Sequence, residues 1–242
     1  FFEGSVAGRT TVSFTSTLAD SRLFANAVLQ DHGDAPPAGF HFVEGHADRM
    51  FYGRTDAFPR RWYWSDPGLP LSLNPDENFY DMTDHESASD VSTGGTGGYK
   101  GMFIAWLERS VWTISGTGAY GGGVVIDLQR RRTNARTGTV SHRTVARIPQ
   151  GSAFLDHDGS PVKFNEVVLA YLTPQKDIRA FDGNNDHIIS HAKERTLKRM
   201  TFAARHKAFC YDDTERSMVT WVFPIDGALE PNYQVSWNYE HG

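Results

Sequence analysis

One stretch of the chain has the spacing of a calcium-binding loop. Asp182, Asn184 and Asp186 alternate as the first three ligands of such a loop do. The sixth position is His187, where glycine is expected, and the twelfth is Lys193, where a bidentate glutamate is expected. An Asx turn that leads into a helix capped by Asp186 explains the same residues without a metal, and we favour that interpretation.

Histidines and carboxylates recur close to this stretch. Asp156, His157 and Asp158 lie on an expected hairpin turn, where they could serve acid–base catalysis or bind a metal. His187 and His191 are four residues apart, so on a helix they would share one face, as the ligands of some zinc sites do. Turn chemistry accounts for the first group, and the second has no evident third ligand. The sequence therefore predicts no metal, no cofactor and no catalytic residue.

Charge is unevenly distributed. Residues 1–100 carry a net charge of −7, residues 101–207 carry +7 and residues 208–242 carry −5. The basic part includes Arg130, Arg131, Arg132 and Arg136. Such a stretch can neutralise DNA phosphates without reading bases. It can equally pair with the acidic N-terminal third of a neighbouring copy, and both interpretations stay open.

The composition indicates which elements must position these side chains. The chain has 242 residues, of which 13% are aromatic and 23 are glycine, and this mixture is typical of β-sandwiches, barrels and propellers. A single cysteine, Cys210, excludes an internal disulfide and is expected to be a buried residue of a strand. The sequence contains no apolar run long enough for a membrane span and no signal peptide. We expect one domain over residues 1–242, or a fragment of a longer chain.

One pattern occurs twice. Lys100 and Lys207 are each followed, after seven residues, by Glu-Arg-Ser and then by a threonine three positions further on. Each copy is an apolar run, a charged turn and a second apolar run, which predicts a β-hairpin. The two copies lie 107 residues apart and are expected at equivalent places in two repeating units.

The remaining pattern predicts short strands separated by glycine- and proline-rich turns. Residues 87–98 and 116–123 read as loops, as does the basic stretch, and one short helix is expected near residues 186–200. Strand pairs recur about every 45 residues, so we expect an all-β, propeller-like array of about four or five antiparallel units. A two-sheet sandwich would use the same residues. The expected strands are 10–17, 23–29, 40–44, 49–52, 61–64, 101–106, 111–115, 124–128, 139–148, 152–155, 162–164, 167–172, 208–211 and 234–239.

The order of several motifs resembles that in propeller-like structural proteins of tailed bacteriophages, especially the tail-tube nozzle proteins of short-tailed phages. The resemblance covers roughly residues 40–242, and these family proteins are generally much longer. The motifs are DRMFYG at 48–53, RWYWSDPG at 61–68, GMFIAW at 101–106, ERSVWTI at 108–114, SAFLDHDG at 152–159 and FDG at 181–183.

This resemblance implies a non-enzymatic virion protein of the tail or head–tail region. Its copies would form an oligomeric ring around the DNA exit channel, together with other tail or head–tail proteins. Two alternatives remain open from the residues themselves. Exposed tryptophans and tyrosines could stack on sugars in a receptor- or glycan-binding propeller, and Asp156, Asp158 or Asp182 could serve a polysaccharide hydrolase.

Overall fold

The computed structural model describes residues 36, 38–84, 89–116, 120–121, 124–125, 128–156 and 158–240. Contacts divide the chain into two compact units, Phe1–Gly33 and Asp34–Gly242, and every described residue belongs to the second. The strands expected at 10–17 and 23–29 lie outside the described residues, so the single domain over 1–242 stays a prediction. No helix in the described part of the chain is long and apolar enough to cross a membrane.

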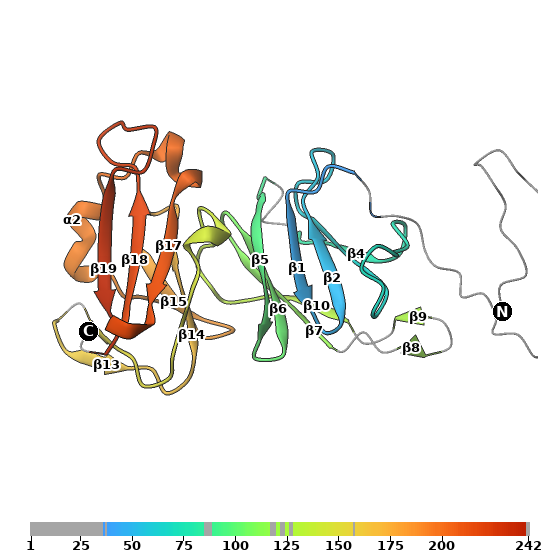
Figure 1. The fold of residues 1–242 in the computed structure, drawn as a ribbon, viewed down its shortest axis with the longest axis horizontal. Helices are drawn as coiled ribbons and strands as arrows, with labels where there is room; N and C mark the ends of the chain where they lie inside the picture. Colours follow the sequence, from blue (N-terminus) through green and yellow to red (C-terminus); the bar gives the residue numbers. More distant parts are fainter. Residues whose placement is uncertain are drawn as a thin grey trace, which may run out of the picture. The chain divides into compact units, whose positions relative to one another are not determined.

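The described residues form four antiparallel sheets that follow one another along the chain (Figure 1). Three sheets have four strands, and the last has three. The first sheet comprises β1 (Phe42–His46), β2 (Arg49–Gly53), β3 (Arg61–Trp64) and β4 (Phe79–Asp81). The second comprises β5 (Ser92–Tyr99), β6 (Met102–Leu107), β7 (Val111–Ser115) and β10 (Gln129–Arg132).

The third and fourth sheets continue the pattern. The third comprises β11 (Ala146–Ile148), β14 (Val168–Leu172), β15 (Ile178–Phe181) and β16 (Asp186–Ile188). The fourth comprises β17 (Phe209–Asp213), β18 (Met218–Phe223) and β19 (Tyr233–Asn238). Two-stranded ribbons are β8 (Tyr120–Gly121) with β9 (Val124–Val125), and β12 (Ala153–Leu155) with β13 (Pro161–Lys163). The helical segments are η1 (His142–Thr144), η2 (His191–Lys193), α2 (Glu194–Leu197), η3 (Phe202–Lys207) and η4 (Thr214–Arg216).

A separate hydrophobic core fills the space between each pair of successive sheets. Strand β6 shows why: Phe103 and Ala105 belong to the core shared with the first sheet, whereas Ile104 and Trp106 belong to the core shared with the third. Side chains alternate between the two faces of a strand, so a strand buried on both faces must be apolar throughout. β14 repeats the arrangement between the third and fourth sheets. The mostly β, multi-sheet prediction is thus confirmed, whereas closure into a propeller is not observed in the described residues.

Strand β5 occupies part of a stretch that the sequence predicts as a loop, so that prediction is wrong. Its glycines allow close approach of neighbouring elements. A Cβ on Gly97 would lie 1.9 Å from the carbonyl oxygen of Gly45, and a Cβ on Gly94 would lie 2.1 Å from His142. Glycine in a strand often marks such an approach, and β5 is also bulged in two places.

The helix is much shorter than expected. Asp186 does not cap it but begins β16, where it pairs with Phe181 across a turn. The only α-helical turn among the described residues is Glu194–Leu197, preceded by η2. Because His187 lies on a strand and His191 on η2, the two histidines do not share a helix face.

Both copies of the repeated pattern form hairpins, as predicted. The first joins β6 to β7, and the second joins β17 to β18 through η4. The two hairpins do not occupy equivalent places, however. The β6–β7 hairpin connects the second and third strands of its sheet, whereas the β17–β18 hairpin connects the first and second strands of its sheet. Different side chains also stabilise the turns. Asp90 accepts the Arg109 N–H at 2.9 Å in the first, and Asp213 accepts the Arg216 N–H at 3.2 Å in the second.

Candidate functional site

A polar cleft of about 600 Å³ lies where the β12–β13 hairpin faces β16. Its wall is built by the loop after β10, which is tied to the turn before β16. The Asn134 N–H donates to the carbonyl oxygen of Asn184 at 2.8 Å, and the Arg136 N–H donates to Asp186 Oδ1 at 3.2 Å. These bonds bring together segments that are about fifty residues apart in sequence.

A buried charged network forms the floor of the cleft. The Asp186 carboxylate is only 2% exposed; its Oδ2 accepts hydrogen bonds from the Tyr171 hydroxyl and from Arg179, both at 3.0 Å. Arg179 also pairs with Asp177 at 3.0 Å. Burial and the nearby Asp186 carboxylate raise the pKa of Tyr171 well above its usual value. Burial opposes the charge on Arg179, but the hydrogen bonds and charges of Asp177 and Asp186 together outweigh that effect and raise its pKa. Because these groups satisfy one another, they form a rigid support for the cleft.

The mouth of the cleft carries more accessible polar groups. His191 Nε2 lies 3.8 Å from Asp156 Oδ1, and His187 and Arg136 are exposed. The cleft can therefore offer hydrogen bonds of several kinds to a polar ligand. Of the three carboxylates considered for a hydrolase, Asp156 lines the cleft, while Asp158 accepts the Ser160 N–H within its own turn. His157 lies outside the described residues.

The stretch with calcium-loop spacing is a turn in this structure. Asp182 Oδ1 accepts the N–H groups of Asn184 and Asn185 at 2.8 and 2.7 Å. Burial raises the pKa of Asp182, but these backbone hydrogen bonds outweigh it and hold the pKa below its usual value. This is the Asx turn that the sequence favours, although it leads into a strand and not into a helix. Within the described ranges, no three His, Cys, Asp or Glu side chains gather as a metal site would require.

The basic stretch lies on β10, an edge strand of the second sheet, and not on a loop. Arg130 and Arg132 point toward the first sheet, where Arg130 lies over the ring of Tyr80 and Arg132 pairs with Asp84. Arg131 lies on the opposite face and is exposed. Arg136 lines the polar cleft, so the structure separates it from the other three.

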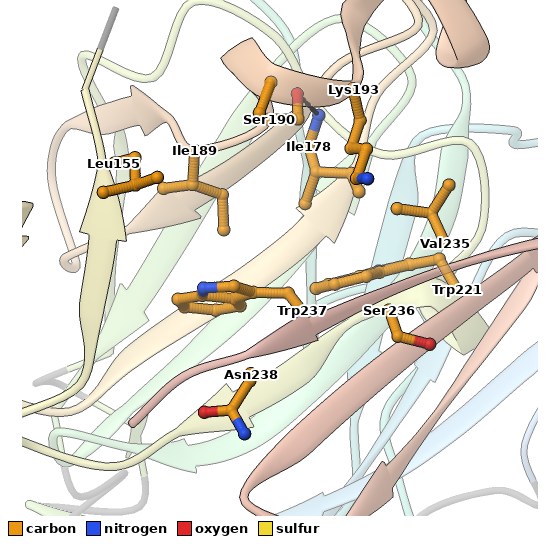
Figure 2. A pocket seen from close by; sticks show the side chains of 11 residues that line it. Leu155, Ile178, Ile189, Ser190, Lys193, Trp221, Val235, Ser236, Trp237 and Asn238 are labelled. Carbon is orange, nitrogen blue, oxygen red and sulfur yellow. Dashed lines mark hydrogen bonds between the residues drawn. The ribbon is translucent and has the colours of Figure 1, made fainter. Parts of the chain in front are cut away.

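A small apolar slot of about 120 Å³ lies between the third and fourth sheets (Figure 2). Its floor is formed by Trp221 and Trp237, whose ring centroids are 6.5 Å apart with 21° between the ring planes. Leu155, Ile178 and Ile189 face this floor from the other side. Leu155 and Phe154 point to opposite faces of the β12–β13 hairpin, so the hairpin separates the slot from the polar cleft.

Sequence reasoning missed the residues that organise the polar cleft. Tyr171 lies in a run that is expected to be a strand, whereas β15, which carries Arg179, is not among the expected strands. Nothing in the spacing of these residues points to Asp186. The sequence signal that could have found the network is the arginine among apolar neighbours, IRAF at 178–181.

No protein-family model matches this chain, and no curated protein matches it either.

Proposed function

We propose that this chain is a structural protein of a bacteriophage virion, located in the tail or head–tail region. Copies of it form an oligomeric ring around the DNA exit channel. The resemblance of its motifs to tail-tube nozzle proteins motivates the proposal, and the succession of small antiparallel sheets supports it. In this role the chain is a scaffold and catalyses no reaction.

The observation that carries the proposal is how the first strands of the four sheets meet. β1 contacts β5, and β5 contacts η1, the segment directly before β11. η1 and β11 in turn contact β17. In a propeller, consecutive blades pack face to face around a common axis. In this chain, consecutive sheets also contact one another in the order of the sequence. This order supports a propeller-like array, which further copies of the chain or further sheets could extend.

The basic stretch fits a subunit contact better than a DNA channel. β5 is the edge strand of the second sheet that contacts β1 and η1, and β10 is the opposite edge strand. Arg131 therefore lies away from the place where the first strands gather. We assign Arg131, exposed and on an edge strand, to a contact with an acidic surface of a neighbouring copy.

Sedimentation velocity of the purified chain tests this assignment. We expect an oligomer that Arg131→Glu dissociates and that Arg195→Glu, a reversal at another exposed arginine, leaves intact. If the Arg131→Glu chain still forms the oligomer, but particles assembled with it no longer release DNA, the arginine would instead be assigned to the channel. A strictly monomeric protein that is absent from virions contradicts the proposed function.

A second function, binding of a host glycan, is favoured by the polar cleft. Asn134, Arg136, Asn185 and His187 are exposed around it and can hydrogen-bond sugar hydroxyls. Glycan-array screening of the wild type and of His187→Ala tests this function. Binding that is lost in the variant supports it, and an array without any signal argues against it.

A further inference from the structure

We propose that the apolar slot receives an aromatic side chain of a partner protein, with an acidic residue beside that side chain contacting Lys193. This contact goes beyond the proposed ring, because it concerns recognition of a different chain. The slot, the residues that hold it open and the charge at its rim each support the proposal.

The dimensions of the slot match one planar ring. Trp237 forms the accessible part of its floor, because Trp221 is fully buried. Leu155 and Ile189 face Trp237 from the other side, so a flat apolar group lying on Trp237 would be contacted on both faces (Figure 2). A fully apolar cavity of about 150 Å³ holds benzene, and the slot, whose walls also include Ser190, Lys193, Ser236 and Asn238, measures about 120 Å³. Leu155, which is 38% exposed, stands at its edge. Buried aromatic anchors in such pockets dominate many protein interfaces.

The slot is held open by hydrogen bonds on both sides. On the ceiling, Ser190 Oγ accepts the Ile178 N–H at 2.9 Å, which fixes the segment that carries Ile189 (Figure 2). On the floor, Trp237 Nε1 donates to the carbonyl oxygen of Ala153 at 3.2 Å. These bonds fix the positions of Ile189 and of the Trp237 indole. A preformed pocket lowers the conformational cost of binding.

Apart from Lys193, the polar side chains of the rim are already hydrogen-bonded, which favours an apolar ring over a sugar. Ser236 Oγ bonds with Thr220 Oγ1 at 2.8 Å, and Asn238 Nδ2 donates to the carbonyl oxygen of Arg216 at 3.2 Å. A sugar bound here would leave hydroxyl groups without partners, and burying unpaired hydroxyls is costly.

The charge at the rim of the slot indicates which residue should stand next to the aromatic residue in the partner chain. Lys193 lines the slot and makes no ion pair with any residue that the structure describes. The adjacent Glu194 pairs with Lys198 at 2.5 Å, and Arg195 is exposed. Lys193 can therefore attract a carboxylate that follows an aromatic residue in a partner chain.

Peptide titration of the full chain, followed by the indole N–H signal of Trp237 in NMR spectra, tests the proposal. The probes are the capped tetrapeptides Gly-Phe-Asp-Gly, Gly-Phe-Lys-Gly and Gly-Ala-Asp-Gly. We expect Gly-Phe-Asp-Gly to bind with a Kd of about 1–10 mM, since a single anchor supplies little affinity. It should bind roughly two- to fivefold more tightly than Gly-Phe-Lys-Gly, as a surface ion pair allows. The alanine peptide should not bind.

Two variants make the result specific to the slot. Ala192→Phe places a ring in the slot from an exposed position and should abolish binding, whereas Ala203→Phe, at an exposed alanine of η3, should not. Lys193→Glu should reverse the preference between the two phenylalanine peptides. Thermal unfolding confirms that each variant is folded. Equal binding of all three peptides, or binding that survives Ala192→Phe, overturns the proposal, as does the absence of any shift at Trp237.

Discussion

The contact between the first two sheets depends on a glycine, and replacing it should be costly. Gly97 of β5 lies so close to β1 that a Cβ would come within 1.9 Å of the carbonyl oxygen of Gly45. Ordinary contact begins near 3.4 Å, so Gly97→Ala must separate the strands by about 1.5 Å. Two hydrogen bonds cross the same contact: the Gly97 N–H donates to Glu44 at 3.4 Å and the Gly98 N–H donates to His46 at 3.2 Å.

The magnitude follows from these contacts. Forcing extra atoms into a packed region costs about 1–3 kcal/mol, and each weakened hydrogen bond adds about 0.5–1.5 kcal/mol. We therefore expect Gly97→Ala to lower the free energy of unfolding by about 3 kcal/mol. For a domain of this size that corresponds to a fall in Tm of about 6–12 °C.

Gly45→Ala is the matched control on the facing strand. A Cβ on Gly45 would lie 3.8 Å from the Met50 sulfur, an ordinary contact distance. Alanine there should leave Tm unchanged or raise it slightly, because the unfolded chain loses freedom. Calorimetry of the two variants decides the matter. Equal Tm values for Gly97→Ala, Gly45→Ala and the wild type would refute the close packing of β1 against β5.

Three further predictions concern single groups. Burial lowers the pKa of His46, whose Nδ1 accepts the Gly98 N–H, so the ring is neutral in the folded protein. Below pH ~6.5, unfolding of the protein therefore takes up a proton at this histidine. The stability that the neutral ring contributes is complete above pH ~6.5 and is lost as the pH falls toward the folded pKa. In urea unfolding, the difference in unfolding free energy between wild type and His46→Asn should therefore shrink below that pH. Asp186→Ala removes a buried partner of Arg179 and should lower the free energy of unfolding, measured by chemical denaturation, by about 3 kcal/mol. Tyr171→Phe should lower it by only about 1 kcal/mol. Equal losses for the two variants would contradict the central place of Asp186 in the buried network. Burial raises the pKa of the Cys210 thiol to about 12, so iodoacetamide at pH 8 should label the native protein far more slowly than the unfolded one.

Local hairpins could be predicted from the sequence because their signals are local. Around both Glu108 and Asp156, a short polar turn separates two runs that have the residue pattern of strands. Both hairpins form in the structure. β5 could not be recognised, because its glycines are selected by contacts with Gly45 and His142 that lie far away in sequence. The role of Asp186 could not be predicted either. An aspartate can cap a helix or accept hydrogen bonds in a buried network, and only the fold shows that Asp186 does the second.

The candidate sites show the same limit. Asp156, His191 and Arg136 could each be noted from the sequence, but not that they line one cleft. That arrangement depends on the loop after β10 meeting the turn before β16. The slot depends on the packing of the third sheet against the fourth, which brings Ile178 to face Trp237.

The central claim is that this chain is a ring-forming component of a phage tail. Cryo-electron microscopy of phage particles that contain the chain tests it most directly. We expect density in the tail or head–tail region into which several copies of the four-sheet unit fit around a central channel. Particles that lack the chain, or that carry it as isolated single copies away from the channel, would contradict the proposed function.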